Sequence, residues 1–535
     1  MSESILAPSR RITTLHQHVP KHPLGVKPLG NQIFASSGDL TKIRDSAGKL
    51  FNALPDDIVL SVFSLLSKDD LANASRVSKF WYAYATFDEL WRKMYTSVSS
   101  ETRQELGIEF LQWKSTWRSS ILNSKEKKPL VDCGGLVYSD TLFTPYSNSC
   151  IDYKEIFRDL IREQENLRDI DESTFTYENF VNNHWTDHPF ILGSKQNDSN
   201  KRWPEWTTKY LLERFPDVKF RQESVLWELA LYESYALQNQ DESPLYLFDC
   251  RSDAMKALLP TGYYEDPPIF AKYDLFKVFE ECRPDHSWLI AGPARSGSTF
   301  HKDPNSTDAW NVVLEGSKLW IMLPPEMKPP GVFVSDDESE VMSPEGLAEW
   351  VKSGFWNDRF RTCVVGITFK NECMYVPSGW WHSVINLEDS VAFTANFVPP
   401  CKIGQVLDFM KNKPAQVSGF RHDLFQKKLR SFMEAQEIDD SENKTTLEKY
   451  LSMEELRNID EDVGELKGTG CMPVYEAFVE LLLAKGMDDI VAKGLRDLKT
   501  ADSKQERSRV WKSLTKDAKS DEKGGFSFGF DFDDE

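Results

Sequence analysis

Residues 296–325, SGSTFHKDPNSTDAWNVVLEGSKLWIMLPP, contain a histidine and an aspartate two positions apart, His301 and Asp303. Side chains two apart in a β-strand lie on the same face, so both can point into a barrel while Lys302 points away. A second segment, CMYVPSGWWHSVINLEDSVAFTANF at 373–397, has a Pro-Ser-Gly turn signal followed by a strand pattern that carries His382. His301, Asp303 and His382 are therefore the candidate catalytic metal ligands.

This set of side chains matches a particular metal chemistry. Two neutral imidazoles and one carboxylate on one side of a ferrous ion leave three coordination positions open, as non-haem iron oxygenases require. A 2-oxo acid fills two of these positions and O2 fills the last. An isolated His-x-Asp pair is common in proteins, and both histidines could instead be hydrogen-bonded structural residues. The neighbouring sequence decides between these interpretations.

Short apolar runs dominate the chain from Phe190 onward and predict the fold of this part. They are separated by Pro, Gly, Asn and Asp, a pattern typical of a β-sandwich or barrel. The runs are 244–248, 288–292, 319–323, 374–376 and 391–397. The charged segment SDDESE at 335–340 is expected to be a surface insertion, and the pattern after Pro400 is helical up to about Ser513.

Four motifs resemble those of the Jumonji-C (JmjC) hydroxylases: SPLYLFDC, GPARSGSTFHKDP, AWNVVLEGSKLW and VPSGWWHSVINLEDSVAFTANF. The similarity is greatest to the subfamily of the arginine demethylase and lysyl hydroxylase once described as a phosphatidylserine receptor. It runs from about Asn183 to Pro399. The resemblance implies a double-stranded β-helix, of the jelly-roll or cupin type, with Fe(II) at His301, Asp303 and His382. It also implies 2-oxoglutarate and O2 as co-substrates.

The same resemblance implies that Lys318 pairs with the distal carboxylate of 2-oxoglutarate. The residues implied to help it are Asn311, Ser298, Thr394 and Tyr246. A buried lysine is costly unless an anion lies opposite it, and the dicarboxylic co-substrate provides that anion. Thr394 and Asn396 alternate with apolar neighbours, so both can face the cavity. Ser298 stands where the subfamily commonly has Thr, which preserves a hydroxyl.

Residues 51–97 resemble an F-box, with a Leu54-Pro55 entry, an apolar first helix and a late Trp91. Ser67 followed by Asp70 matches a capping box at the start of a second helix. The resemblance implies docking on a Skp-type adaptor and, through it, a link to a cullin ubiquitin ligase. In the alternative interpretation, three amphipathic helices only pack against the barrel.

We therefore expect an α+β multidomain protein with an N-terminal three-helix F-box, a JmjC core and a helical C-terminal region. The expected parts are a disordered leader (1–50), the F-box (51–97), a helical or irregular connector (98–170), the JmjC catalytic domain (171–400), a helical C-terminal region (401–513) and a disordered acidic tail (514–535).

The acidic composition makes a basic protein partner more natural than nucleic acid, but acidity is also ordinary for a soluble protein, so charge alone does not decide the partner. The net charge of −20 argues against a broad phosphate-binding surface, which needs clustered Lys and Arg. The eight cysteines show no zinc-site spacing, and neither a signal peptide nor a membrane-spanning run is present. We expect a protein of the nucleus, the cytoplasm or both.

Two main function classes follow, with a third, weaker possibility beside them. The leading one is an oxygenase that hydroxylates a protein side chain or removes an N-methyl group through a hydroxymethyl intermediate, on histones among other proteins. The rival is a ubiquitin-ligase substrate receptor with a non-catalytic barrel, and a zinc or manganese cupin is a weaker third possibility. We expect hydroxylation of a basic side chain to predominate, because recognition of methyl-ammonium often uses an aromatic cage. Trp310, Trp380 and Trp381 are interpreted as core residues instead, and His184 and His188 as structural.

Overall fold

The structure is a computed structural model of the chain. It describes residues 19–34, 47–124, 131–158, 170–182, 184–193, 203–259, 266–271, 273–343, 346–352, 363–435, 442–452 and 472–503. The predicted acidic tail and most of the predicted leader lie outside these residues. The chain divides into two compact units. The first comprises Met1–Ala271, His286–Asp303 and Asp308–Asn396, and the second Lys272–Asp285, Pro304–Thr307 and Phe397–Glu535.

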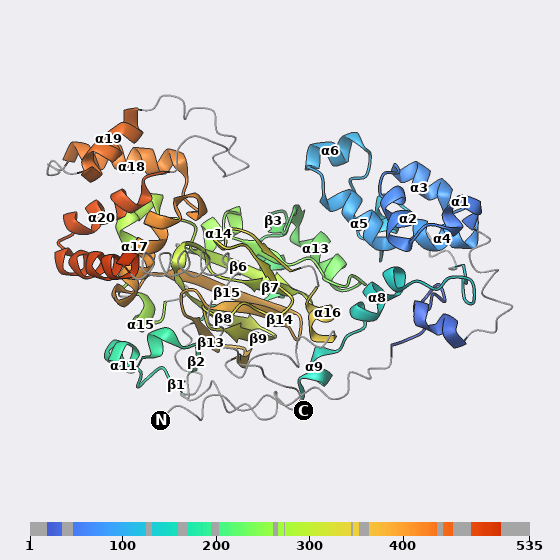
Figure 1. The fold of residues 1–535 in the computed structure, drawn as a ribbon, viewed down its shortest axis with the longest axis horizontal. Helices are drawn as coiled ribbons and strands as arrows, with labels where there is room; N and C mark the ends of the chain where they lie inside the picture. Colours follow the sequence, from blue (N-terminus) through green and yellow to red (C-terminus); the bar gives the residue numbers. More distant parts are fainter. Residues whose placement is uncertain are drawn as a thin grey trace, which may run out of the picture. The chain divides into compact units, whose positions relative to one another are not determined.

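Two β-sheets form the centre of the first unit (Figure 1). The larger has nine strands in the order β1-β2-β13-β8-β15-β6-β5-β3-β4. These are β1 (Ile170–Asp171), β2 (Phe190–Gly193), β3 (Lys219–Gln222), β4 (Val225–Glu228), β5 (Leu247–Asp249), β6 (Ser287–Gly292), β8 (Asp308–Glu315), β13 (Cys373–Val376) and β15 (Ser390–Phe397). The smaller sheet has four strands in the order β12-β9-β14-β7. These are β7 (Gly297–His301), β9 (Ser317–Leu323), β12 (Val364–Phe369) and β14 (Trp381–Asn386).

An apolar layer lies between the two sheets. Its members are Ile191, Ala309, Met374 and Val376 from the larger sheet with Trp320, Met322, Val364 and Val384 from the smaller one. Successive side chains in a strand point to opposite faces. On β9, Trp320 and Met322 thus face the interior, whereas Leu319 and Ile321 belong to a separate core on the outer face. By the same alternation Lys318 faces the interior.

The two facing sheets confirm the expected fold class, which includes a double-stranded β-helix core. Each of the five predicted apolar runs overlaps a strand: β5, β6, β9, β13 and β15. The acidic segment 335–340 connects β10 (Phe333–Val334) with β11 (Val341–Met342), a separate two-stranded hairpin. The outer face of the smaller sheet packs against α16 (Leu347–Lys352), whose Trp350 and Val351 are buried there.

Short helices form the region that resembles an F-box. They are α1 (Lys49–Asn52), α2 (Asp56–Phe63), α3 (Lys68–Ala74), α4 (Lys79–Ala85) and α5 (Asp88–Thr96), drawn in blue in Figure 1. The Ser67 side chain accepts a hydrogen bond from the Asp70 amide, so the predicted cap of the second helix is confirmed. On α2, Val59 and Phe63 are buried, whereas Ile58 and Val62 are 48% and 39% exposed. An apolar stripe therefore remains on the surface.

The first unit contains further helices. They are α6 (Ser100–Glu105), α7 (Trp117–Ile121), α8 (Asp140–Ser149), α9 (Tyr153–Ile156), α11 (Tyr177–Asn182), α12 (Thr208–Arg214), α13 (Leu229–Ala236), α14 (Asp253–Leu258) and α15 (Pro268–Ala271). Part of the predicted mobile leader is built into this unit. Val26 is buried, and Lys27 forms a β-bridge with Tyr138. This part of the sequence has no run of apolar residues that would predict the contact.

The second unit is helical, as expected for the C-terminal region. Its helices include α17 (Ile403–Asn412), α18 (His422–Ala435), α19 (Glu442–Ser452), α20 (Val474–Ala484) and a helix over 488–503, and the 3-10 helix η5 (Leu275–Cys282) belongs to it as well. Phe279 of η5 stacks on Phe478 of α20 with ring centroids 5.3 Å apart, inside one shared apolar core. Among the helices that the structure describes, none is long and apolar enough to cross a membrane.

Candidate active site

The pairing of β7 with β14 brings the three predicted metal ligands together. His301 and His382 are register partners in this antiparallel pair, and their ring centroids are 4.2 Å apart. Asp303 lies two residues beyond the end of β7, so the strand supplies His301 and the following loop supplies the carboxylate. One ligand atom from each residue lies within 4.8 Å of the others. In the described part of the chain this is the one such group of potential ligands.

A glycine allows the two ligand-bearing strands to approach closely. A Cβ atom at Gly297 would lie 1.9 Å from the Val384 carbonyl oxygen. Any residue larger than glycine would therefore force one of the two strands to move. The pairing also shifts register between His382 and Val384, next to the ligand. Bulges of this kind often redirect a side chain beside an active site.

Backbone carbonyls orient both imidazoles. His301 Nδ1 lies 2.8 Å from the Thr299 oxygen, and His382 Nδ1 lies 3.1 Å from the Trp380 oxygen. A carbonyl oxygen only accepts hydrogen bonds, so Nδ1 carries the proton in each ring. Nε2 then has the free lone pair, which is the usual arrangement of a metal-binding histidine.

Burial shapes the charges of the three ligands. It raises the pKa of Asp303, against the opposing effects of His301 and of a hydrogen bond from Asn396. It lowers the pKa of His382, and His301 lowers it further, so His382 is neutral as a ligand must be. Among the described residues, the buried Oδ2 of Asp303 has no hydrogen-bond partner. A buried carboxylate oxygen without a partner is costly, and a divalent cation between the three side chains removes that cost.

The donor set therefore fits the expected metal. Two nitrogen ligands and one oxygen ligand, all within 4.8 Å of one another, match the donor set of non-haem iron sites with a facial triad.

Lys318 is fully buried and lies in a polar corner of the interior. Its Nζ donates to the Tyr246 hydroxyl at 2.8 Å and to Asn386 Oδ1 at 2.7 Å. Asn386 is held in turn, because its Nδ2 donates to Ser296 Oγ at 2.9 Å and to the Gly292 oxygen. An ammonium has three N–H donors, so these two bonds leave one for an anion.

The charge of Lys318 is unfavourable in the protein alone. Burial lowers its pKa from 10.5 to about 7, and no carboxylate of the described residues offsets this. A dicarboxylic ligand beside Nζ would restore the charged form. The corner thus fits the distal carboxylate of 2-oxoglutarate.

The remaining predicted co-substrate residues have different surroundings. Asn311 follows the interior residue Ala309 by two positions on β8, and among the described residues its buried Oδ1 has no hydrogen-bond partner. The Thr394 hydroxyl donates to the Trp310 carbonyl at 2.7 Å. Asn396 hydrogen-bonds to Asp303 and so lies beside the predicted metal ligands.

Ser298 is half-buried on β7, and its carbonyl accepts from the Ser383 hydroxyl at 2.8 Å. Within the described residues Lys318 bonds to Tyr246 and Asn386, and not to Ser298, Asn311 or Thr394. Of the helpers predicted for the lysine, the structure therefore brings Tyr246 into direct contact.

Asn386 is a candidate site residue that the sequence did not single out. It is fully buried and directly opposite Lys318 in the β9–β14 register. A signal was present in the sequence, because Asn386 follows His382 by four positions in one strand and so faces the same side.

The aromatic residues near the site are core, as expected. Trp310, Trp380 and Trp381 are at most 6% exposed. Lys302 points away from the ligands, with Nζ 4.7 Å from the Trp381 ring centroid and 2.9 Å from Glu338.

Comparisons with known proteins agree with this geometry. Residues 288–397 match the description "JmjC domain, hydroxylase", and residues 51–97 match "F-box-like". The chain is 33% identical over 436 residues to the arginine-specific demethylase JMJ22 of Arabidopsis thaliana, covering 76% of this chain and 81% of that protein. This chain belongs to the JmjC family. The predicted fold class and the predicted F-box resemblance are confirmed with it.

Other relatives of this JmjC protein match smaller parts of the chain. The bifunctional arginine demethylase and lysyl-hydroxylase psr-1 of Caenorhabditis elegans is 30% identical over 249 residues, 44% of this chain and 62% of that protein. The 2-oxoglutarate and iron-dependent oxygenase JMJD4 homolog of Drosophila melanogaster is 28% identical over 193 residues, 36% of this chain and 42% of that protein. Together these findings confirm the predicted enzyme class, an Fe(II)- and 2-oxoglutarate-dependent oxygenase.

Proposed function

We propose that this JmjC protein hydroxylates a C–H bond in a lysine or arginine side chain of a protein. The observation that carries the proposal is the His301, Asp303 and His382 group, together with the buried cation Lys318 on the same inner face of the smaller sheet as His382. In the overall reaction one atom of O2 enters the C–H bond. The other atom ends in succinate as 2-oxoglutarate loses CO2, so atoms and electrons balance.

We assign roles to the side chains as follows. His301, Asp303 and His382 hold the ferrous ion, and carbonyl contacts at Nδ1 fix the tautomer of both rings. Lys318 binds the distal carboxylate of 2-oxoglutarate, oriented by Tyr246. When bound, the iron and the co-substrate supply the oxidation by O2. The other polar groups that we assign to this site are Asn311, Ser298, Thr394, Asn396 and Asn386.

The basic substrate is supported by two observations. The relatives JMJ22 and psr-1 are named for action on arginine or lysine. The chain has a net charge of −20, and such a protein attracts Lys/Arg-rich segments over long range. Histones and other basic proteins fit this description.

N-methyl demethylation is the second candidate, because the relative JMJ22 is named an arginine-specific demethylase. The first step would be the same, since hydroxylation of an N-methyl carbon gives a hydroxymethyl amine that releases formaldehyde. We favour hydroxylation, because Trp310, Trp380 and Trp381 are buried in the core and do not form a cage for a methylated cation.

Matched peptides distinguish the two reactions. Unmodified and N-methylated forms of one lysine- or arginine-containing sequence are offered with Fe(II), 2-oxoglutarate and O2, and each mass change is followed. A gain of one oxygen on the unmodified peptide supports hydroxylation. Turnover of methylated peptides alone, with release of formaldehyde, supports demethylation and overturns our preference.

We further propose that residues 51–97 bind a Skp-type adaptor and link the enzyme to a cullin ligase. The exposed stripe of Ile58 and Val62 on α2 supports this, because apolar side chains at helical spacing favour a protein partner. The rival function, a substrate receptor with an inactive barrel, is less well supported. The complete ligand group and the buried Lys318 have no evident use in a barrel that only binds. Residence in the nucleus, the cytoplasm or both stays a prediction, which fluorescence imaging of the tagged protein would test.

A further inference from the structure

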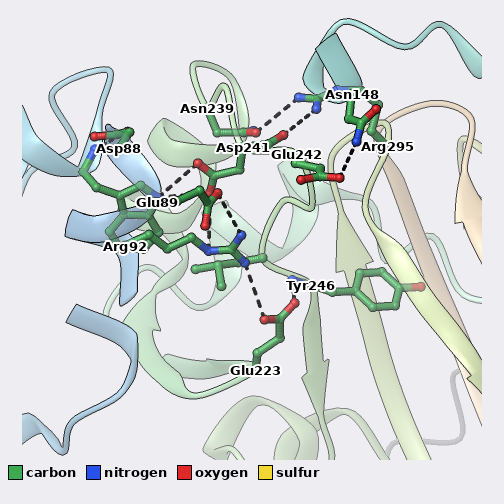
Figure 2. A network of polar contacts seen from close by, with 12 residues as sticks. Asp88, Glu89, Arg92, Asn148, Glu223, Asn239, Asp241, Glu242, Tyr246 and Arg295 are labelled. Atoms are coloured by element: carbon green, nitrogen blue, oxygen red, sulfur yellow. Dashed lines mark hydrogen bonds and ion pairs between the residues drawn. The ribbon is translucent and has the colours of Figure 1, made fainter. Parts of the chain in front are cut away.

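The last helix of the F-box region contacts the turn between β3 and β4 of the barrel. Arg92 of α5 lies 3.9 Å from Glu223, which occupies this turn (Figure 2). Three residues further along α5, the Tyr95 hydroxyl accepts a hydrogen bond from Trp227 Nε1 at 3.0 Å. The helix therefore contacts both the turn and the strand that follows it.

Arg92 lies among three carboxylates. Its side chain is 15% exposed and also faces Glu89 at 3.5 Å and Asp241 at 3.9 Å (Figure 2). Asp241 is itself anchored, because its carboxylate accepts from Trp117 Nε1 at 3.0 Å and from the Tyr235 hydroxyl at 2.6 Å. The guanidinium thus joins an ordered network instead of a mobile surface pair.

Glu223 connects this network with the co-substrate corner. One carboxylate oxygen faces Arg92, and the other accepts from the backbone amide of Tyr246 at 3.2 Å. Its φ of +50° lies in the left-handed region, which costs a non-glycine residue about 1 kcal/mol and requires surrounding contacts to maintain it. The hydroxyl of the same Tyr246 accepts from Lys318 Nζ at 2.8 Å.

A continuous series of polar contacts therefore runs from the F-box region to the lysine that we assign to 2-oxoglutarate. Its members are Arg92, Glu223, Tyr246 and Lys318. We infer that Arg92 and Glu223 are positioning residues that set the affinity for 2-oxoglutarate through Tyr246. The inference rests on the proposed role of Lys318.

The physical reason lies in the balance of charges at the turn. Without Arg92, Glu223 would lose its ion-pair partner, and burial and the negative charge of Asp241 would both disfavour its charged form. Repulsion would then displace the Glu223 carboxylate and, with it, the amide of Tyr246. The phenol would no longer hold Lys318 in one orientation. The F-box region thus acts as part of the co-substrate site, in addition to any adaptor that it binds.

The test uses full-length variants that remove or keep the cation at position 92 and the hydrogen-bond acceptor at position 223. Arg92→Met removes the cation, Arg92→Lys keeps it, Glu223→Ala removes both contacts, and Glu223→Gln keeps an acceptor for the Tyr246 amide. Lys93→Met is the matched control, because Lys93 is the exposed neighbour of Arg92 on α5. For each protein we would measure 2-oxoglutarate binding by calorimetry with redox-inert Ni(II), Fe(II) binding, and KM and kcat for 2-oxoglutarate turnover.

We expect Arg92→Met and Glu223→Ala to raise the Kd and KM for 2-oxoglutarate roughly 5- to 20-fold, with kcat and metal affinity within about twofold of wild type. Arg92→Lys and Lys93→Met should remain near wild type, and Glu223→Gln should lie between. Arg92→Met combined with Glu223→Ala should be no worse than the stronger single variant, since both interrupt one series of contacts.

Two results would overturn the inference. One is an unchanged 2-oxoglutarate Kd in both Arg92→Met and Glu223→Ala. The other is a parallel loss of metal and 2-oxoglutarate binding, which would mean that these residues only support the fold. Failure of the proposed function looks different, because the wild-type protein itself would then neither bind nor turn over 2-oxoglutarate.

Discussion

Replacing Lys318 by Met tests the assignment of the co-substrate corner. The substitution keeps most of the side-chain volume but removes the ammonium that donates to Tyr246 and Asn386. If the third N–H of Lys318 binds the distal carboxylate of 2-oxoglutarate, the variant must place that carboxylate in a buried corner without a cation.

The structure gives the size of the effect. Lys318 is 0% exposed, so water does not replace the lost contact. Removing one partner of a buried, hydrogen-bonded charge pair costs about 2–4 kcal/mol, which corresponds to a rise of roughly 30- to 1,000-fold in Kd. Fe(II) affinity should change by less than about threefold, because Lys318 is not a ligand.

In the absence of 2-oxoglutarate, Lys318→Met should not lower the stability of the protein. Burial lowers the pKa of Lys318 to about 7, so near neutral pH the folded state bears the cost of an unpaired buried lysine. Lys318→Met removes this cost, and the variant should unfold at an equal or higher temperature than wild type.

Calorimetry with Ni(II)-loaded protein and thermal unfolding followed by circular dichroism measure both effects. A change of less than threefold in the 2-oxoglutarate Kd would refute the role of Lys318. An equal loss of metal and 2-oxoglutarate binding, together with a lower unfolding temperature, would show a folding defect instead.

The other predictions concern pH, the adaptor and the strand pair. Because Lys318 must be charged to bind the carboxylate and its pKa is about 7 without it, 2-oxoglutarate affinity should be constant below pH 7 and fall as pH rises above 7, by up to about tenfold per unit. A titration between pH 6 and 9 should show this fall in wild type and not in Lys318→Met; identical profiles would contradict it. The double substitution Leu54→Ala and Pro55→Ala should abolish pull-down of a Skp-type adaptor but not oxygenase turnover, with the 87% exposed Leu111→Ala as control. Adaptor binding retained by the double variant would assign these helices to the catalytic unit alone. Gly297→Ala should separate β7 from β14, destabilise the fold by about 1–3 kcal/mol and weaken Fe(II) binding, and wild-type Fe(II) affinity would contradict the close approach of the strands.

Local sequence patterns predicted much of the fold. The alternation around His301 and His382 identified strands and the interior face, and the Ser67 cap located the start of α3. These features depend on neighbours a few residues apart, which the sequence displays directly. The sequence did not predict that Asp303 lies beyond the end of β7, because the end of this strand depends on its pairing with β14.

Contacts between distant segments could not be predicted in this way. Asn386 meets Lys318 because β14 pairs with β9 in one particular register, and a shift of one residue would turn either side chain to the outer face. The contact of Arg92 with Glu223 joins two elements 131 positions apart, both charged and partly exposed. Single charged residues carry no periodic signal, so only the assembled structure shows their pairing.

The measurement that tests the central claim most directly is succinate formation from 2-oxoglutarate by the purified full-length protein, with Fe(II) supplied or chelated, in wild type and Asp303→Ala. Asp303 is the ligand whose buried Oδ2 has no hydrogen-bond partner among the described residues. We predict Fe(II)-dependent turnover in wild type, and loss of both turnover and Fe(II) binding in Asp303→Ala while the unfolding temperature is maintained. Unchanged turnover in the folded Asp303→Ala variant, with iron occupancy measured alongside, would contradict the assignment of the site.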